Sequence, residues 1–372
     1  MTQVIGFDVA PLLVANFSGV STYTQQLLEA LLARADDRQY VPLAHRAVNG
    51  QVPKGAAAPI GQPYQRRWWW MQMIAPKLLA DLRPSFAHFT NSIAPLASPV
   101  PVVLTIHDMS LFVQAHTQPL RSLLTVRPIM PAAARRAAAI ITVSQHARQA
   151  MIRLMKIDPA KVHVVYNAPA TRFKPVTDSD KLDRVRRQYA LPATFVLYVG
   201  TFEPRKNIPR LLRAFAQVRR ARPDVRLVMA GQLGWKHRAI WQAIESLGLA
   251  DAVQWLGYVP ACDLPVLYSQ ATALAFPSLY EGFGLPVIES MACGTPVLTS
   301  QCSALSEVAG DAALLIDPLE VDTIAAGLIR LLDDSALRDE LRARGLCRAG
   351  EFSWARAAAE TVKVYEQVMG DA

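Results

Sequence analysis

Two glutamates, Glu281 and Glu289, stand on either side of a glycine-lined turn in the segment FPSLYEGFGLPVIESMACGTPV, residues 276–297. The apolar run before this segment predicts a buried strand, and Gly282 and Gly284 allow a tight turn into a helix. Such a turn offers free N–H groups and the positive end of a helix dipole, which suit a diphosphate. Carboxylates there suit a ribose hydroxyl or a sugar. The alternative is an ordinary βαβ unit with a solvated glutamate at each end.

A second loop combines two cations with a helix start. The predicted strand 195–199 is followed by Gly200, which frees the turn, and then by Arg205 and Lys206, with a helix predicted to begin near Asn207. Arginine binds phosphate in a bidentate way, and lysine adds a point charge. The sequence therefore predicts a phosphate-binding loop here, with two exposed basic residues as the alternative.

Polar residues also follow two buried strands predicted in the first half of the chain. His107 comes directly after strand 102–106, and Asn91 comes after strand 86–89. Open α/β sheets bind ligands at the carboxyl ends of their strands, so both side chains are candidates for a ligand cleft. A lone histidine at such a place is more often a structural hydrogen-bonding group, and that alternative stays open.

Two predicted helix starts add candidates. Ser144 follows a predicted strand and suits a helix N-cap, while Arg148 either points into a cleft or braces its helix. Gly19 would let a substrate approach the backbone near the first helix, with Ser18 or Ser21 as the cap. The pattern G-x-G-x-x-G is absent here, which disfavours a Rossmann dehydrogenase.

Together these segments resemble the retaining glycosyltransferases of family four (glycosyl transferases group 1), and among them bacterial mannosyltransferases of polysaccharide and O-antigen assembly. The matching patterns are E-x7-E at 281–289, G-x-x-x-x-R-K-N at 200–207, G-x-x-x-Y at 19–23 and V-S-x-x-x-R at 143–148. The resemblance covers nearly the whole chain. It implies an α/β protein of the GT-B fold, with two Rossmann-like domains facing across a cleft and a C-terminal helix that crosses back to the first. The predicted ranges are 1–172 for an acceptor-binding domain, 173–354 for a nucleotide-sugar-binding domain and 355–372 for the returning helix.

The resemblance also implies roles for individual residues. Glu281 would lie near the transferred sugar, which His107 would also reach, and Glu289 would hold the ribose hydroxyls. The implied catalytic residues are Glu281, His107, Arg205 and Lys206, with the two cations neutralising the leaving diphosphate. The implied donor-binding residues are Gly19, Gly200, Arg205, Lys206, Tyr258, Val259, Glu281, Gly282, Phe283, Gly284, Leu285 and Glu289, with Tyr258 and Val259 at the base. The acceptor or cleft candidates are Asn91, His107, Ser144 and Arg148.

The reaction implied is transfer of a sugar, with mannose from GDP-mannose as the first choice, to a glycan or polyprenyl-diphosphate-linked acceptor in cell-surface polysaccharide synthesis. A UDP- or dTDP-sugar donor is one alternative, and a sugar-nucleotide epimerase or a non-catalytic binder on the same fold is another. A front-face substitution with retention needs no dedicated general base. The pattern D-x-D occurs only at 178–180, inside a predicted interdomain linker over 171–183, where a solvated turn is expected. We therefore expect no metal and no cofactor.

The positive charge of the chain lies in its first half. Residues 1–170 hold 16 Lys and Arg against 7 Asp and Glu, whereas residues 171–372 hold 23 of each. This distribution fits contact with an anionic membrane surface or a diphosphate-linked acceptor, a merely basic surface being the alternative. Nothing resembles a nucleic-acid module. No apolar run approaches the roughly 20 residues of a membrane span, and the four cysteines lack C-x-x-C spacing. We expect a cytoplasmic protein with reduced thiols, peripheral on the inner face of the cell membrane if it contacts lipid.

One aromatic segment allows two interpretations. Arg66-Arg67-Trp68-Trp69-Trp70 suits an interfacial helix on anionic lipid, or a core helix with two surface arginines. The core helix is favoured, because three consecutive tryptophans cannot all face one side of a helix. The Pro-, Gly- and Ala-rich stretch before it, residues 45–65, predicts a mobile surface loop.

Overall fold

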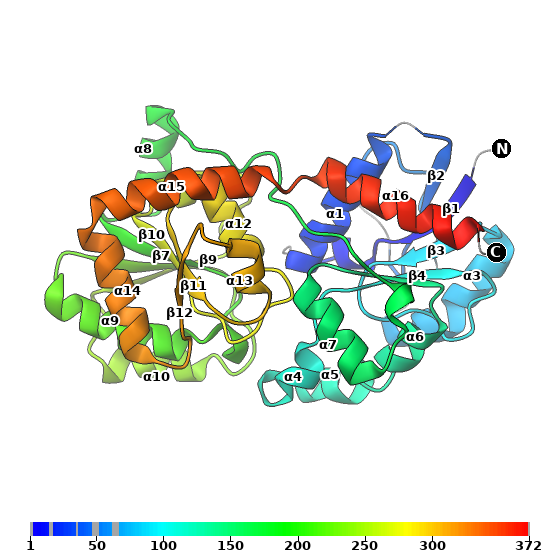
Figure 1. The fold of residues 1–372 in the computed structure, drawn as a ribbon, viewed down its shortest axis with the longest axis horizontal. Helices are drawn as coiled ribbons and strands as arrows, with labels where there is room; N and C mark the ends of the chain where they lie inside the picture. The colour runs from blue at the N-terminus through cyan, green and yellow to red at the C-terminus, as the bar shows by residue number, and fades with distance from the viewer. Residues whose placement is uncertain (1–2, 15–17, 35, 47–51, 62–66, 371–372) are drawn as a thin grey trace. The chain divides into compact units, whose positions relative to one another are not determined.

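The structure is a computed structural model that describes residues 3–14, 18–34, 36–46, 52–61 and 67–370. Its contacts divide the chain into two compact units, residues 1–167 with 353–372, and residues 168–352 (Figure 1). The first boundary lies five residues before the predicted position of 172, and residues 353–372 rejoin the first unit as a segment of its own.

The described part of the first unit holds a six-stranded parallel sheet in the order β2-β1-β3-β4-β5-β6. Its strands are β1 (Gln3–Asp8), β2 (Arg38–Leu43), β3 (Phe86–Phe89), β4 (Val102–Ile106), β5 (Ala139–Thr142) and β6 (Val162–Val164). β3 and β4 have the predicted ranges, 86–89 and 102–106. β2 begins with polar residues and contains Pro42. Proline is tolerated there because β2 is paired with β1 alone among the named strands.

The strands are joined by helices that follow most of the expected starts. They are α1 (Gly19–Leu32), α2 (Arg67–Trp69), the π-helical η2 (Trp70–Ile74), α3 (Ala75–Leu82), α4 (Ser110–Val113), α5 (Leu120–Thr125), α6 (Met130–Arg136), α7 (Gln145–Met155) and α16 (Trp354–Gly370), with 3₁₀ turns η1 (Ala10–Leu12), η3 (Ala115–Thr117) and η4 (Pro159–Lys161). Of the two expected caps, Ser18 is the N-cap of α1, in a capping box with Ser21.

The C-terminal helix α16 packs on α1 within the first unit (Figure 1). Its apolar face is buried, and Tyr365 has no exposed surface. The Tyr365 hydroxyl lies 2.7 Å from Nδ1 of His88, whose Nε2 lies 2.8 Å from Oγ1 of Thr105. These contacts tie α16 to β3 and β4.

The aromatic segment is a core helix, as favoured, but one of its arginines is half-buried. Trp70 is fully buried while Trp69 is 43% exposed, so the tryptophans are divided between core and surface. Arg67 donates to Oδ2 of the fully buried Asp8 at 2.8 Å. Its side chain is 24% exposed, so it is half-buried and not fully at the surface, because the carboxylate at the end of β1 needs a cation. The other arginine, Arg66, lies outside the described residues.

The loop predicted over residues 45–65 begins with a buried side chain. His45 is 7% exposed, because the chain continues beyond β2 and Ala44 N–H donates to the Ile60 carbonyl at 3.0 Å. The prediction of a surface loop is wrong at this residue. Residues 47–51 and 62–65 of the loop lie outside the described part of the chain.

The second unit, as far as it is described, has its own six-stranded parallel sheet in the order β12-β11-β10-β7-β8-β9. Its strands are β7 (Phe195–Val199), β8 (Arg226–Ala230), β9 (Val253–Gly257), β10 (Ala273–Phe276), β11 (Val297–Ser300) and β12 (Leu314–Ile316). The runs β7 and β10 are almost wholly buried, as their apolar sequences predict.

The helices of this unit pack against the strands and against one another (Figure 1). They are α8 (Ser179–Gln188), η5 (Pro204–Lys206), α9 (Ile208–Ala221), α10 (Arg238–Ser246), α11 (Leu264–Gln270), α12 (Leu285–Ala292), α13 (Ala304–Ala309), α14 (Val321–Asp333) and α15 (Ser335–Gly350). The linker predicted over 171–183 is wrong from Ser179 onward, where α8 begins. Asp178 caps this helix by accepting from Lys181 N–H at 3.2 Å, so the predicted turn is a helix start. Asp178 and Asp180 are exposed to solvent, as predicted.

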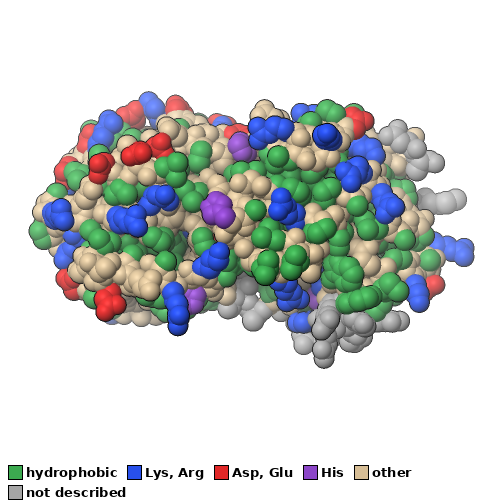
Figure 2. Space-filling model, turned by 90° about the horizontal axis from the view of Figure 1, so that it is seen from below, with side chains coloured by type: hydrophobic (Ala, Val, Ile, Leu, Met, Phe, Trp, Pro, Cys, Tyr) green, Lys and Arg blue, Asp and Glu red, His purple; other side chains and the backbone are tan. Residues whose placement is uncertain are grey.

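Figure 2 shows how charge is distributed over one face of the molecule. On the face shown in Figure 2, the part at the right mixes basic side chains with apolar ones and carries few acidic ones, whereas the part at the left carries both signs. No helix within the described ranges is long and apolar enough to cross a membrane.

Candidate functional site

The strand order of the second unit reverses beside β7. The chain leaves β7 toward β8 and β9 on one side, and later fills β10, β11 and β12 on the other. The loops that follow β7 and β10 therefore diverge at the same sheet edge, which is where open α/β sheets bind ligands. Both motifs singled out in the second half of the sequence lie in these two loops.

The loop after β7 is held rigidly. Gly200 has a φ of +154°, and a Cβ there would lie 3.0 Å from the Tyr198 hydroxyl. Asn207 takes a left-handed conformation at φ 61° before α9 begins. Its side-chain amide donates to the carbonyls of Pro277 and Pro318, at 3.0 and 2.6 Å. This asparagine thus fixes Arg205 and Lys206 against the loop that follows β10.

The loop after β10 delivers backbone groups to the same edge. Gly284 has φ +103°, and a Cβ there would lie 2.6 Å from Cδ2 of Leu305, so only glycine fits. Gly284 also occupies the N-cap of α12 and supplies no side-chain cap to its first turn. The neighbouring Phe283 turns its ring onto Phe352, 5.7 Å between centroids, so this side chain belongs to the core.

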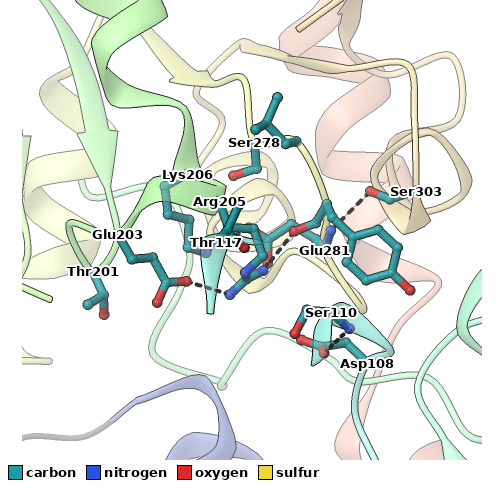
Figure 3. A network of polar contacts seen from close by, with 12 residues as sticks. Asp108, Ser110, Thr117, Thr201, Glu203, Arg205, Lys206, Ser278, Glu281 and Ser303 are labelled. Atoms are coloured by element: carbon teal, nitrogen blue, oxygen red, sulfur yellow. Dashed lines mark hydrogen bonds and ion pairs between the residues drawn. The ribbon is translucent and has the colours of Figure 1, made fainter. Parts of the chain in front are cut away.

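A compact ion cluster joins the two loops (Figure 3). One carboxylate oxygen of Glu281 accepts from Lys206 Nζ at 2.7 Å, and the other accepts from Arg205 Nη1 at 2.7 Å. The second Nη of Arg205 donates to Glu203 at 2.6 Å. The backbone N–H of Glu281 donates to the Ser303 hydroxyl at 3.1 Å. Glu281, Arg205 and Lys206, which the sequence placed in separate motifs, thus meet in one buried cluster.

The electrostatics of this cluster favour charged groups. Burial opposes ionisation of Glu281, but the charges of Arg205 and Lys206 and their hydrogen bonds outweigh it and lower its pKa to about 2. Two cations and two carboxylates, Glu203 being the second, balance the formal charge. Lys206 also lies over the Phe276 ring, with Nζ 4.9 Å from its centroid. The site is therefore a preassembled, nearly dry set of charges.

Glu289 lies apart from these ion pairs, farther along α12. The Tyr268 hydroxyl donates to its carboxyl at 3.1 Å, and both side chains are buried. Burial raises the pKa of Glu289 to about 7, because the hydrogen bond from Tyr268 and the charge of Arg172 compensate only in part. The pKa values of Glu281 and Glu289, which belong to one motif, are therefore shifted in opposite directions.

The remaining predicted donor residues differ in exposure. Tyr258, just after β9, is 43% exposed, so its ring is available to a ligand, while Val259 is buried. Gly282 is buried in the loop, and Leu285 opens α12. Gly19 is exposed as the first residue of α1.

Two candidates of the first unit are held in place by hydrogen bonds. His107 is held in place, since its Nε2–H donates to the Thr90 carbonyl at 2.8 Å and its ring meets Tyr23 edge-on at 4.6 Å. Burial lowers its pKa, which favours the neutral imidazole. The side chain of Ser144 is fully buried and caps α7 by accepting from Ala147 N–H at 3.1 Å.

Bracing, and not a cleft position, is the role that the structure shows for Arg148. Its guanidinium donates to the carbonyls of Val162 and Pro159, both at 3.0 Å. Asn91 lies elsewhere, in the lining of a pocket at the edge of the first sheet.

Sequence reasoning missed two members of the ion cluster. Glu203 stands two positions before Arg205, and its place in the same loop was a usable signal. Ser303 gave no signal, because its hydroxyl reaches Glu281 only through the packing of α13 against α12.

Two doubly wound units, one with this cluster where its strand order reverses, define a two-domain α/β protein of the GT-B class. Family models match the chain as Glycosyltransferase Family 4 over residues 17–171 and Glycosyl transferases group 1 over residues 182–346. The chain is 35% identical over 265 residues to O-antigen chain mannosyltransferase B of Escherichia coli, covering 71% of this chain and 70% of that one. It is 34% identical over 241 residues to MMP alpha-(1->4)-mannosyltransferase of Mycolicibacterium hassiacum, covering 63% and 56%.

A solved structure shares the fold along the whole chain. HepE of Anabaena, determined with UDP and glucose, superposes with a TM-score of 0.78 at 18% identity and covers 98% of this chain and 100% of that one. The chain therefore belongs to the family-four glycosyltransferases (glycosyl transferases group 1), and the predicted GT-B fold and family are confirmed.

No group of three or more His, Cys, Asp and Glu residues within the described part of the chain is arranged to hold a metal ion. That no metal takes part stays a prediction, which chelation tests.

Proposed function

We propose that this glycosyltransferase moves mannose, with retention of configuration, from GDP-mannose to a glycan or lipid-linked glycan acceptor. The observation that carries the proposal is the buried cluster of Glu281, Arg205 and Lys206 beside the uncapped start of α12. The names of the two relatives described above, both mannosyltransferases, support the choice of sugar.

The cluster suits the charge that develops when a sugar–phosphate bond breaks. Arg205 and Lys206 are 13% and 11% exposed in their side chains, so a diphosphate beside them interacts with little screening by water. Glu281 balances them before the donor binds, which avoids burying two unpaired cations. A donor diphosphate then supplies the balancing charge, and Glu281 is left to face the sugar.

The bond changes need no dedicated base. The bond between the anomeric carbon and the diphosphate oxygen breaks, and its electrons stay on the diphosphate. The acceptor hydroxyl oxygen bonds to the same face of the anomeric carbon, and its proton passes to the departing phosphate oxygen. Arg205 and Lys206 stabilise the departing charge, Glu281 stabilises the cationic sugar, and Glu289 holds the ribose.

A second candidate keeps the reaction and changes the donor. HepE was solved with UDP and glucose, and it shares the fold of this chain. A UDP-sugar donor is therefore the competing proposal.

The test is to incubate the full chain with methyl α-mannoside and each of GDP-mannose, UDP-glucose, UDP-N-acetylglucosamine and dTDP-rhamnose, in EDTA. We expect GDP release with GDP-mannose and an α-linked product by NMR. A β-linked product would contradict retention, product from a UDP-sugar alone would replace the donor, and no release of any nucleotide would contradict the activity. Lys206→Ala should lower kcat by about 10² to 10³. Lys181→Ala, at a 64% exposed lysine of the same unit, is the matched control.

A further inference from the structure

The first sheet also reverses its strand order, and a pocket lies at that reversal. β1 is flanked by β2 on one side and by β3 on the other. A pocket of about 350 Å³ opens among the segments that follow these three strands and the start of α1. Its polar lining comes from Ser18, Ser21, His45, Arg46, Arg67 and Asn91. Crevices at such reversals are the usual ligand sites of open α/β sheets.

Two buried nitrogens at this pocket have no hydrogen-bond partner among the residues that the structure describes. His45 is 7% exposed, and its Nδ1 is unpaired. Nε of Arg67 is buried and unpaired as well, although Nη2 of the same guanidinium donates to Asp8. A buried polar atom without a partner costs free energy, so such atoms at a pocket indicate a ligand that satisfies them. A guanidinium can only donate hydrogen bonds, so a ligand that satisfies it must carry a hydrogen-bond acceptor.

The charge around the pocket indicates which kind of hydrogen-bond acceptor would bind there. The described lining residues include two arginines and a histidine but no carboxylate. Asp8 offsets one arginine through its ion pair, which leaves the exposed Arg46 uncompensated within the lining. Burial, and then the charge of Arg67, lower the pKa of His45, so a further cation is unwelcome here. The pocket is built for an anion.

The apolar part of the lining indicates that the anion is not a free ion. Leu13, Val14 and Val20 line the same pocket, and Val14 is 39% exposed. A hydrated phosphate alone would gain nothing from these walls, whereas a phosphate attached to an apolar chain would bury part of that chain against them.

We propose that this pocket binds a phosphate or diphosphate group of the acceptor, held by His45, Arg46 and Arg67. The identity of the ligand as an acceptor rests on the proposed function, whereas the affinity of the pocket for phosphate does not. The first unit thus binds the anionic end of an amphiphilic acceptor by groups separate from the ion cluster after β7.

The test is calorimetric titration of the full chain with inorganic pyrophosphate and with farnesyl diphosphate. Arg46→Gln should weaken both affinities about tenfold, the scale of one charge-assisted hydrogen bond, and His45→Phe should weaken them as well. Arg153→Gln, at an exposed arginine on α7 outside the lining, is the matched control and should change neither. Because pyrophosphate can also bind beside Lys206, the titrations are repeated in Lys206→Gln, where binding at the pocket should persist.

Three results would overturn the proposal. They are no binding of either probe, binding lost in Lys206→Gln and unchanged in Arg46→Gln, and binding of farnesol as tight as that of its diphosphate. Competition with vesicles of phosphatidylglycerol distinguishes the two sources of the phosphate. If the vesicles displace labelled farnesyl diphosphate as well as the unlabelled compound does, the pocket binds a lipid headgroup and the acceptor assignment fails. A melting shift with GDP-mannose that Arg46→Gln leaves unchanged would show that the donor site survives whichever way these titrations fall.

Discussion

Both sheets reverse their strand order, beside β1 in the first unit and beside β7 in the second, yet the charged groups at the two places are satisfied differently. At the second reversal each carboxylate oxygen of Glu281 accepts a bond from a cation at 2.7 Å. At the first, Asp8 is paired, while Nδ1 of His45 and Nε of Arg67 have no partner within the described ranges. The cluster of the second unit is thus paired before any ligand binds, whereas the pocket of the first contains buried nitrogens that have no partner in the described part of the chain. A site whose charged groups are already paired must exchange those partners when a ligand binds. A site with unpaired groups can gain hydrogen bonds to a ligand without losing any.

The largest effect is expected on turnover. Lys206→Ala removes a cation that faces the departing diphosphate, so kcat should fall by about 10² to 10³. Initial rates of GDP release from GDP-mannose measure it, with Lys181→Ala as the control. A rate within threefold of the wild-type rate would show that the cluster is a structural ion pair only.

The next effect is on stability at the cluster. Glu281→Gln keeps the shape but leaves Lys206 without its carboxylate, and should destabilise the protein by about 3 kcal/mol at pH 7 in urea denaturation. Because the pKa of Glu281 is lowered to about 2, its contribution is present above about pH 4.5 and is lost as the pH falls toward 2. The gap between variant and wild type should therefore shrink over that range. Glu245→Gln, at an exposed glutamate on α10, should show no gap at any pH.

A smaller loss is expected at the first reversal. Arg67→Gln leaves the buried Asp8 with the Ala10 N–H as its remaining donor, and should cost about 2 kcal/mol. The double variant Asp8→Asn, Arg67→Gln should recover most of the loss, because no buried charge is then left unpaired. If the single variant is as stable as the wild type, the ion pair is not what holds Arg67 in place.

The smallest effect on stability is expected for Glu289→Gln, whose pH dependence is opposite to that of Glu281→Gln. The pKa of Glu289 is raised to about 7, so the stability given by its neutral form is present below about pH 4.5 and is lost as the pH rises through 7. Glu289→Gln cannot ionise. It should match the wild type at pH 4 and exceed its stability by about 1–2 kcal/mol at pH 6, in urea denaturation at the two pH values. A variant less stable than the wild type at both pH values would contradict the buried, neutral state.

The parts of the fold that the sequence predicted are those with strong local signals. The apolar runs of β7 and β10 and the glycines after them identified the second sheet edge, and Arg205, Lys206 and Glu281 were placed in the correct loops. That these three residues pair with one another could not be predicted, because it depends on Asn207 bridging the loops after β7 and β10.

The errors lie where tertiary contacts override composition. His45 stands in a Pro-, Gly- and Ala-rich stretch but is buried, because the chain after β2 pairs with Ile60. Helix α8 was missed because its sequence is almost wholly polar and only Val185 is buried. Arg67 was assigned to the surface because nothing in the sequence links it to Asp8, 59 positions earlier.

The central claim is that the cluster after β7 binds a nucleotide sugar. The most direct measurement is the melting temperature of the wild type and of Lys206→Ala with GDP, GDP-mannose, UDP and dTDP, each in EDTA. A ligand that binds only the folded state must raise it. We predict a rise with GDP and GDP-mannose in the wild type, unchanged by EDTA and lost in Lys206→Ala. No rise with any nucleotide, or an equal rise in both proteins, would contradict the claim.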